Sequence, residues 1–251
     1  MALPTDCALH HFPFSHYNEK VRWALDVKQA PHRRVPYRPG WHIPLLRWLS
    51  GQTQVPVMEV DGALILGSAD IIDWIERTWP EPALYPSDPQ ARELALAHQR
   101  WADEAIGPHL RRALYWEILP DTAYMAASFS YGLGAPLRTV YRVQFPVFRW
   151  FMRRYMNIYD APAERSREHL ARALDELVER LDGRPYLVED RFTIADLAVV
   201  AMLGPVTDLA GYVDWVQPRS PTAQTWFSRW EGHPAIPWLQ RVWTEHRRQV
   251  S

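Results

Sequence analysis

One turn near the start of the chain carries the residues best suited to chemistry. An apolar strand at 6–12 leads into Pro13 and Phe14, and Ser15 then stands directly before a predicted helix that runs to about Lys28. The first backbone N–H groups of a helix have no partner inside the helix, and the positive end of its dipole lies beside them. This turn therefore favours an anion, to which the Ser15 hydroxyl can donate a hydrogen bond.

The same turn lacks the two thiols that disulfide exchange requires. A Cys-x-x-Cys pair would occupy the positions that here read Ser15 and Asn18. Cys7 is the only cysteine and lies eight residues before Ser15, at the start of an apolar strand. A free cysteine in such a place ordinarily acts as a small buried hydrophobe. The turn can hold the thiolate of another molecule, but it has no thiol of its own.

A purely structural role for Ser15 stays open, whereas a metal site at the neighbouring histidines fails on geometry. Serine is a preferred N-cap, so Ser15 could serve the helix alone. His10 and His11 suggest a metal site, but adjacent strand residues point to opposite faces and cannot share an ion. No other group of histidine, cysteine and carboxylate side chains has ligand spacing, so we predict no metal.

Composition restricts the class of protein. The chain has 251 residues, enough for one large domain or two small ones, and its formal net charge of -1 argues against a nucleic-acid partner. No apolar run approaches the ~20 residues that a membrane span needs. The start of the chain does not resemble a signal peptide, and a lone cysteine cannot form an internal disulfide. We therefore expect a cytoplasmic protein without a membrane partner.

The first eighty residues alternate strands and helices. The strand at 6–12 and a second at 33–37 are joined by one helix, which implies parallel pairing. The segment 39–50 reads as irregular with one helical turn, Asp61-Gly62 predicts a hairpin between strands at 55–60 and 63–66, and Ser68 is expected to cap a helix over 69–79.

The pattern changes after a proline-rich stretch that begins at Pro80. Thr193 and Asp196 form a capping box before a buried helix, and no strand is predicted after residue 90. The sequence therefore predicts an α/β half followed by an all-α half, the latter with helices over 90–115, 140–159 (kinked at Pro146), 162–181, 194–203 and 234–248.

Four motifs, taken in order and spacing, resemble the cytosolic glutathione S-transferases over almost the whole chain, and the serine-type, bacterial-like members in particular. They are Ser15-His16-Tyr17-Asn18-Glu19-Lys20-Val21-Arg22, Gln54-Val55-Pro56-Val57, Gly67-Ser68-Ala69-Asp70-Ile71-Ile72, and the capped helix from Phe192 to Val200. The resemblance implies a thioredoxin-like domain at 1–80, a linker at 81–89 and an all-helical domain at 90–251.

The resemblance also implies a site and a reaction. Ser15 would stabilise the thiolate of glutathione, the co-substrate, for attack on an apolar electrophile, as in detoxification by a homodimeric enzyme. Val55, before a cis Pro56, would pair with the peptide backbone, and Ser68 would bind the γ-glutamyl carboxylate. Further residues expected to contact glutathione are Tyr17, Asn18, Gln54 and Asp70.

Two departures from the family pattern open an alternative. Gly67 stands where the family usually has an acid or amide that meets the γ-glutamyl end, and the chain is longer than usual between Tyr115 and Asp160. That region holds twelve aromatic residues, which suit a pocket or a core. Arginines at 138, 142, 149 and 153 suit a solvated helix face, an acidic partner or a substrate carboxylate. A non-catalytic scaffold with a degenerate site is therefore the alternative, and a thiol oxidoreductase that uses Cys7 is disfavoured.

Overall fold

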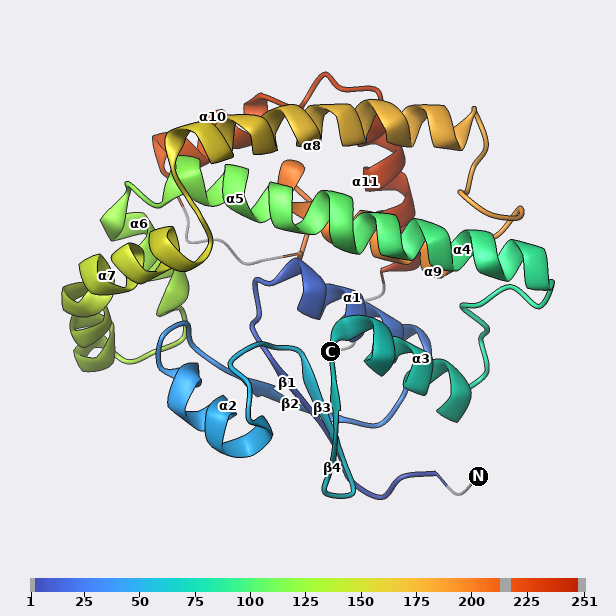
Figure 1. The fold of residues 1–251 in the computed structure, drawn as a ribbon, viewed down its shortest axis with the longest axis horizontal. Helices are drawn as coiled ribbons and strands as arrows, with labels where there is room; N and C mark the ends of the chain where they lie inside the picture. Colours follow the sequence, from blue (N-terminus) through green and yellow to red (C-terminus); the bar gives the residue numbers. More distant parts are fainter. Residues whose placement is uncertain (1–2, 213–217, 248–251) are drawn as a thin grey trace.

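The computed structural model describes residues 3–212 and 218–247, which form a four-stranded sheet with its helices, followed by a helical half (Figure 1). The elements of the first half are β1 (Cys7–His11), α1 (His16–Val27), β2 (Arg33–Pro36), α2 (His42–Ser50), β3 (Val57–Val60), β4 (Ala63–Leu66) and α3 (Ser68–Thr78).

The sheet has the order β2-β1-β3-β4 and is mixed. β2 runs parallel to β1, whereas β3 is antiparallel to both β1 and β4. The hairpin between β3 and β4 turns through Asp61 and Gly62, which both have positive φ (46° and 84°), as the tight turn of a twisted hairpin requires. The thioredoxin-like arrangement predicted from the sequence is thus confirmed.

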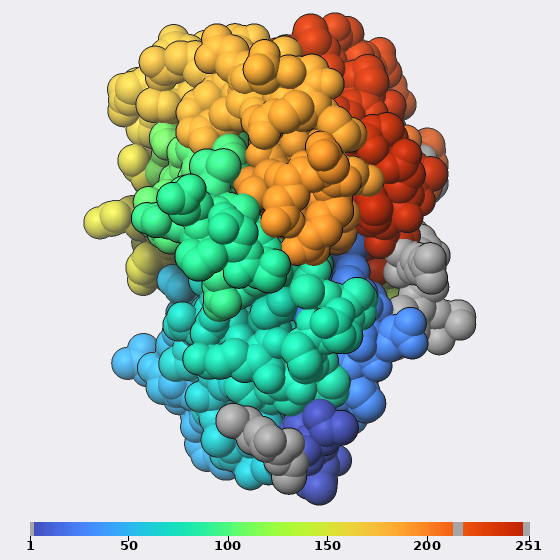
Figure 2. All heavy atoms as spheres, turned by 90° about the vertical axis from the view of Figure 1, so that its right-hand side faces the viewer, coloured from blue at the N-terminus to red at the C-terminus, as the bar shows by residue number. Residues whose placement is uncertain are grey.

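The second half is helical throughout its described part, without strands after β4 in residues 67–212 and 218–247. Its elements are α4 (Pro89–Trp101), the π-helical turn η1 (Ala102–Ile106), α5 (Gly107–Ile118), α6 (Thr122–Phe129), α7 (Ala135–Tyr155), α8 (Asp160–Leu181), α9 (Ile194–Leu203), the 3-10 turn η2 (Gly204–Val206), α10 (Pro221–Ser228) and α11 (Ala235–His246). Seen from the side, the helical half covers the α/β half, with α8 beside α11 (Figure 2).

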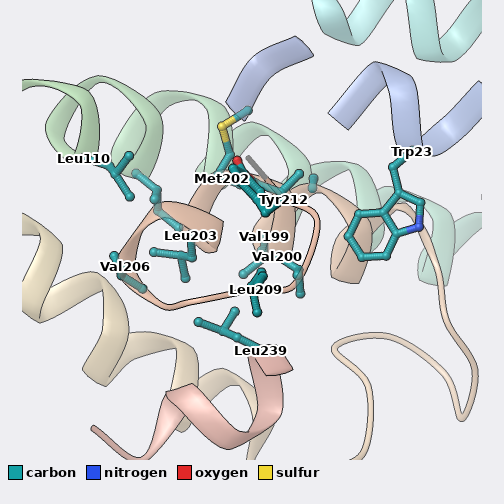
Figure 3. Packing of buried hydrophobic residues seen from close by; sticks show 14 of the residues in the cluster. Trp23, Leu110, Val199, Val200, Met202, Leu203, Val206, Leu209, Tyr212 and Leu239 are labelled. Atoms are coloured by element: carbon teal, nitrogen blue, oxygen red, sulfur yellow. The ribbon is translucent and has the colours of Figure 1, made fainter. Parts of the chain in front are cut away.

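The α9 helix lies at the centre of the core. Every one of its residues is buried, and it packs against α1, α4 and α11. Figure 3 shows Leu203 and its neighbours on α9 surrounded by Leu110 of α5, Leu239 of α11 and Trp23 of α1. The capping box predicted at Thr193 is present in full. Because α1 contacts α9 directly, the central helix also supports the first turn of α1.

Several predicted elements need correction. The segment 39–50, predicted to be irregular with one helical turn, contains the longer helix α2, whose C-cap is Gly51 with φ of 72°. The helix predicted over 90–115 is interrupted by η1, where Tyr17 and Lys20 of α1 both hydrogen-bond to Asp103. Helices α6 and α10 were not predicted, and α7 lies earlier than expected but does contain Pro146. The predicted end of the last helix at Arg248 falls outside the described residues.

The segment 79–88 between α3 and α4 is attached on both sides. Glu76 of α3 accepts hydrogen bonds from the backbone N–H groups of Leu84 and Tyr85, at 3.1 and 3.0 Å. From the helical half, Arg191 donates to the carbonyl oxygen of Ala83 at 2.8 Å.

In the described residues, no helix is long and apolar enough to cross a bilayer.

Candidate functional site

Three of the predicted site segments meet at one end of the sheet. The antiparallel pairing of β1 with β3 ends with His10 opposite Val57, and that of β3 with β4 ends with Val57 opposite Leu66. The chain after β1, the chain before β3 and the chain after β4 therefore leave the sheet at the same end. The turn that holds Ser15, the Val55–Pro56 peptide and the first turn of α3 are therefore neighbours.

Ser15 occupies the N-cap position of α1 with an extended backbone (φ -89°, ψ 127°). Its carbonyl oxygen accepts from Glu19 at 2.8 Å, so the helix begins here, but its side chain makes no capping hydrogen bond. Ser15 is half-buried, and no partner for its hydroxyl lies within the part of the chain that the structure describes. The hydroxyl is therefore available to a ligand at the positive end of the α1 dipole.

Arg22 fixes the backbone on which Ser15 stands. Its guanidinium donates to the carbonyl oxygens of Phe12 and Pro13, at 2.9 and 2.7 Å, and pairs with buried Glu19. Burial, with the adjacent Arg22 charge, lowers the pKa of His11 to about 3, so this histidine is neutral at pH 7. Arg22 thus holds the backbone carbonyls of Phe12 and Pro13, while the Ser15 hydroxyl has no partner among the described residues.

The Val55–Pro56 peptide bond is cis, as the resemblance implies. Pro56 is buried, Val55 is half-buried, and Gln54 before them is exposed. Within the described residues, the backbone N–H and C=O of Val55 have no hydrogen-bond partner. An extended peptide could pair with this backbone as an added strand.

Ser68 is not the cap of α3, contrary to the sequence prediction. Gly67 is the N-cap, with φ of 87°, and Ser68 is the first helical residue, only 8% exposed. Any residue other than glycine would be strained at this φ. Asp70 is exposed in the first turn of α3.

Tyr17 and Asn18 face the interior. The Tyr17 hydroxyl donates to the carbonyl oxygen of Asp103 at 2.6 Å, and burial raises its pKa to about 12. The Asn18 side chain is fully buried, and its carbonyl oxygen accepts from the backbone N–H of Phe12 at 3.3 Å. Its amide nitrogen, also buried, has no hydrogen-bond partner. The predicted contacts of Tyr17, Asn18 and Gln54 with glutathione stay predictions.

An aromatic stack joins this turn to the helical half. Phe14, next to Ser15, stacks on Phe129 of α6 with ring centroids 4.8 Å apart, and Phe129 in turn contacts Tyr115 of α5 at 6.3 Å. Arg111 precedes Tyr115 by one helical turn and is half-buried. Arg111 was not predicted as a site residue from the sequence. Its spacing of four residues from both Gly107 and Tyr115 indicates that the three share one helix face.

The twelve aromatic residues between Tyr115 and Asp160 do not line one pocket. Phe129, Tyr141 and Phe145 belong to the core, whereas Trp150 and Tyr155 of α7 are 62% and 79% exposed. The arginines of α7 also differ in role, since Arg149 donates to the Thr122 hydroxyl and Arg153 lies over the ring of Trp116. Among the described residues, no group of three or more histidine, cysteine or acidic side chains could hold a metal ion.

Comparisons with known proteins agree with this geometry. The glutathione S-transferase N-terminal domain matches residues 9–83, and the glutathione S-transferase C-terminal domain matches 160–229. The two segments together span more than half of the chain, which belongs to the glutathione S-transferase superfamily.

Individual relatives are distant. The chain is 24% identical over 234 residues to glutathione S-transferase TCHQD of Arabidopsis thaliana, covering 87% of this chain and 84% of that protein. It is 37% identical over 86 residues to maleylacetoacetate isomerase of Pseudomonas aeruginosa, covering 31% and 41%. Among solved structures, the β-etherase LigF of Sphingobium sp. strain SYK-6 superposes with a TM-score of 0.61 at 20% identity, covering 94% and 99%. That last likeness concerns the fold.

Proposed function

We propose that this protein is a glutathione transferase of the serine type, in which the Ser15 hydroxyl donates a hydrogen bond to the glutathione thiolate. The observation that carries the proposal is the meeting of Ser15, Val55 and Ser68 at one sheet end, with both hydroxyls unpartnered in the described residues. Membership of the superfamily supports glutathione as the co-substrate.

Each part of the tripeptide has a complementary group. The cysteinyl backbone would pair with the free N–H and C=O of Val55, and the γ-glutamyl carboxylate would lie at the first turn of α3 near Ser68. Asp70 would meet the α-amino group, since Gly67 brings no side chain. We also propose the domain division 1–80, 81–89 and 90–251, a cytoplasmic location and a homodimer.

The reaction needs the thiolate, a minor form of glutathione at neutral pH. Lowering the thiol pKa by one unit requires about 1.4 kcal/mol of preferential stabilisation of the anion. The Ser15 hydroxyl and the α1 N-terminus would both contribute to it. The thiol proton leaves to solvent, the sulfur forms a bond to the electrophilic carbon, and the leaving group departs with its electron pair. In a conjugate addition, a proton is instead taken up at the neighbouring carbon.

The test is the Ser15→Ala variant with glutathione and 1-chloro-2,4-dinitrobenzene. We expect kcat to fall about 10- to 100-fold, because the removed donor acts on the developing charge. Calorimetry should show glutathione affinity within about threefold of the wild type, because the peptide contacts remain. The ultraviolet absorbance of the bound thiolate should titrate at higher pH in the variant.

Matched variants separate this role from a general effect. Ser15→Thr retains a hydroxyl and should keep most activity, and Ser220→Ala removes a serine N-cap of α10 outside the proposed site and should leave kcat unchanged. Full activity in Ser15→Ala would remove Ser15 from the mechanism. If the wild type binds no glutathione at millimolar concentration, the scaffold alternative replaces the enzyme.

A further inference from the structure

One face of α5 looks onto the proposed thiolate site. Gly107, Arg111 and Tyr115 are four residues apart along the helix and therefore share that face. At its start, a Cβ on Gly107 would lie 2.4 Å from the Tyr17 hydroxyl, so α5 and α1 are in closest contact there. This contact explains why a glycine stands at that position.

The other end of the same face reaches the turn through aromatic rings. Tyr115 contacts Phe129, and Phe129 stacks on Phe14, the residue before Ser15. Gly107 packs against Tyr17, and Tyr115 is linked to Phe14 through Phe129. The residue midway between Gly107 and Tyr115 on α5 therefore lies opposite the segment from Phe14 to Tyr17. That residue is Arg111.

The charge on Arg111 has no counter-ion in the described part of the chain. The guanidinium is half-buried, and no carboxylate lies within 4.0 Å of it among those residues. Its charge acts on the first turn, since burial and then Arg111 lower the pKa of His16 to about 3. A guanidinium presents a planar array of donors that fits a carboxylate, so the unpaired Arg111 is suited to bind one.

A second arginine strengthens the positive character of this side. Arg38 donates to the backbone carbonyl oxygens of Tyr37 and Tyr131, and it too has no carboxylate within 4.0 Å in the described residues. Burial lowers the pKa of Arg38. Arg111 and Arg38 are therefore both cations without a carboxylate partner among the described residues.

We propose that the second substrate of this transferase carries a carboxylate, which Arg111 binds while the unsaturated or aromatic body of the substrate packs near Phe14 and Phe129. The inference rests on the proposed function and narrows its substrate class, because the sequence predicts only a hydrophobic electrophile. Arg111 is then the residue that selects acidic electrophiles.

A matched pair of electrophiles tests the inference. 1-Chloro-2,4-dinitrobenzene is neutral, and 4-chloro-3,5-dinitrobenzoate undergoes the same substitution but carries a carboxylate. In both, the glutathione sulfur displaces chloride, which leaves with the bonding electrons, and the thiol proton goes to solvent. We expect the wild type to have a KM about tenfold lower for the benzoate, because a charge-assisted pair is worth roughly that factor.

The Arg111→Gln variant should abolish this preference selectively. Its KM for the benzoate should rise about tenfold relative to its KM for the neutral compound, so that the preference of the wild type is lost. Arg111→Lys, which retains the charge, should recover part of the preference. The control is Arg142→Gln on exposed α7, which removes one positive charge away from the site and should change neither KM.

Binding separates a failure of the inference from a failure of the proposed function. The glutathione adducts of the two electrophiles are titrated by calorimetry into wild type and Arg111→Gln. Tighter binding of the carboxylated adduct by the wild type, lost in the variant, supports the inference even if turnover is slow. Equal binding of both adducts by the wild type overturns the inference alone. A wild type that binds neither adduct and no glutathione overturns the proposed function together with it.

Discussion

The helices α1 and α9 both begin at a hydroxyl-bearing residue, and the two hydroxyls are in opposite states. At α9, the Thr193 side chain accepts a hydrogen bond from Ala195, and Asp196 accepts from the backbone N–H groups of Thr193 and Leu187, at 2.9 and 2.8 Å. Both Thr193 and Asp196 are fully buried. At α1, Ser15 is half-buried and caps nothing with its side chain.

The difference distinguishes a structural helix start from one that is open to a ligand. The donors at the start of α9 are used inside the protein, so an anion has nothing left to bind there. At α1 the carbonyl oxygens of Phe12 and Pro13 accept from Arg22, while the Ser15 hydroxyl remains unused in the described residues. Serine and threonine are equally good N-caps by composition, so only the three-dimensional partners tell the two helix starts apart.

The largest expected effect comes from removing Asp196, the acid of the capping box at the start of α9. Asp196→Ala leaves the buried N–H groups of Leu187 and Thr193 without acceptors, and we expect the free energy of unfolding to fall by about 3–5 kcal/mol. Urea denaturation followed by tryptophan fluorescence measures this. A fall below about 1 kcal/mol would mean that the capping box contributes little, and the comparison with α1 would fail.

The pH dependence of stability gives the next effect. Burial raises the pKa of Asp196 to about 6 from the ordinary value of 3.8, despite its hydrogen bonds, so the folded state holds this proton more tightly than the unfolded state. The contribution of Asp196 therefore favours folding below about pH 4 and declines as pH rises through about 6. Two pKa units correspond to about 3 kcal/mol.

Asp196→Asn isolates this contribution, because the amide does not titrate. The difference in unfolding free energy, wild type minus variant, should decrease by about 3 kcal/mol from pH 4 to pH 7. Other carboxylates titrate in both proteins and cancel in the difference. A difference that stays constant over this range would show that the Asp196 pKa is not raised.

Local signals explain the features that could be predicted from the sequence. The hairpin at Asp61-Gly62, the capping box at Thr193 and the start of α1 at Ser15 depend on residues only a few positions apart. The prediction of an α/β half before a helical half was right because strand and helix periodicities change near Pro80.

The features that were missed depend on contacts between distant segments. The π-helical turn in the long helix coincides with the hydrogen bonds of Tyr17 and Lys20 to Asp103, more than eighty residues away. The cap at Gly67 is a matter of backbone dihedral angles, which composition does not reveal. Arg111 gains its meaning only once α5 lies against the first turn.

A smaller effect tests whether the Tyr17 hydroxyl stabilises the fold or takes part in the reaction. Tyr17→Phe removes the hydrogen bond to the Asp103 carbonyl and should lower the free energy of unfolding by about 1 kcal/mol. Glutathione conjugation should stay within twofold of the wild type. Tyr212→Phe is the control, because its hydroxyl also donates to a carbonyl oxygen, that of Ala201 at 2.6 Å, and should have a similar effect on stability. A loss of turnover in Tyr17→Phe comparable to that of Ser15→Ala would place Tyr17 in the chemistry.

The smallest expected effect is the stability change of Ser15→Ala. Because the Ser15 side chain makes no capping hydrogen bond, its loss should change the free energy of unfolding by less than about 0.5 kcal/mol. Ser220 supplies the contrast, since its side chain accepts from Ala223 at the start of α10 and Ser220→Ala should cost about 1 kcal/mol. Both values come from urea denaturation in one buffer without glutathione. A destabilisation of Ser15→Ala equal to that of Ser220→Ala would mean that Ser15 is a cap in solution, and its hydroxyl would then be engaged before any thiolate arrives.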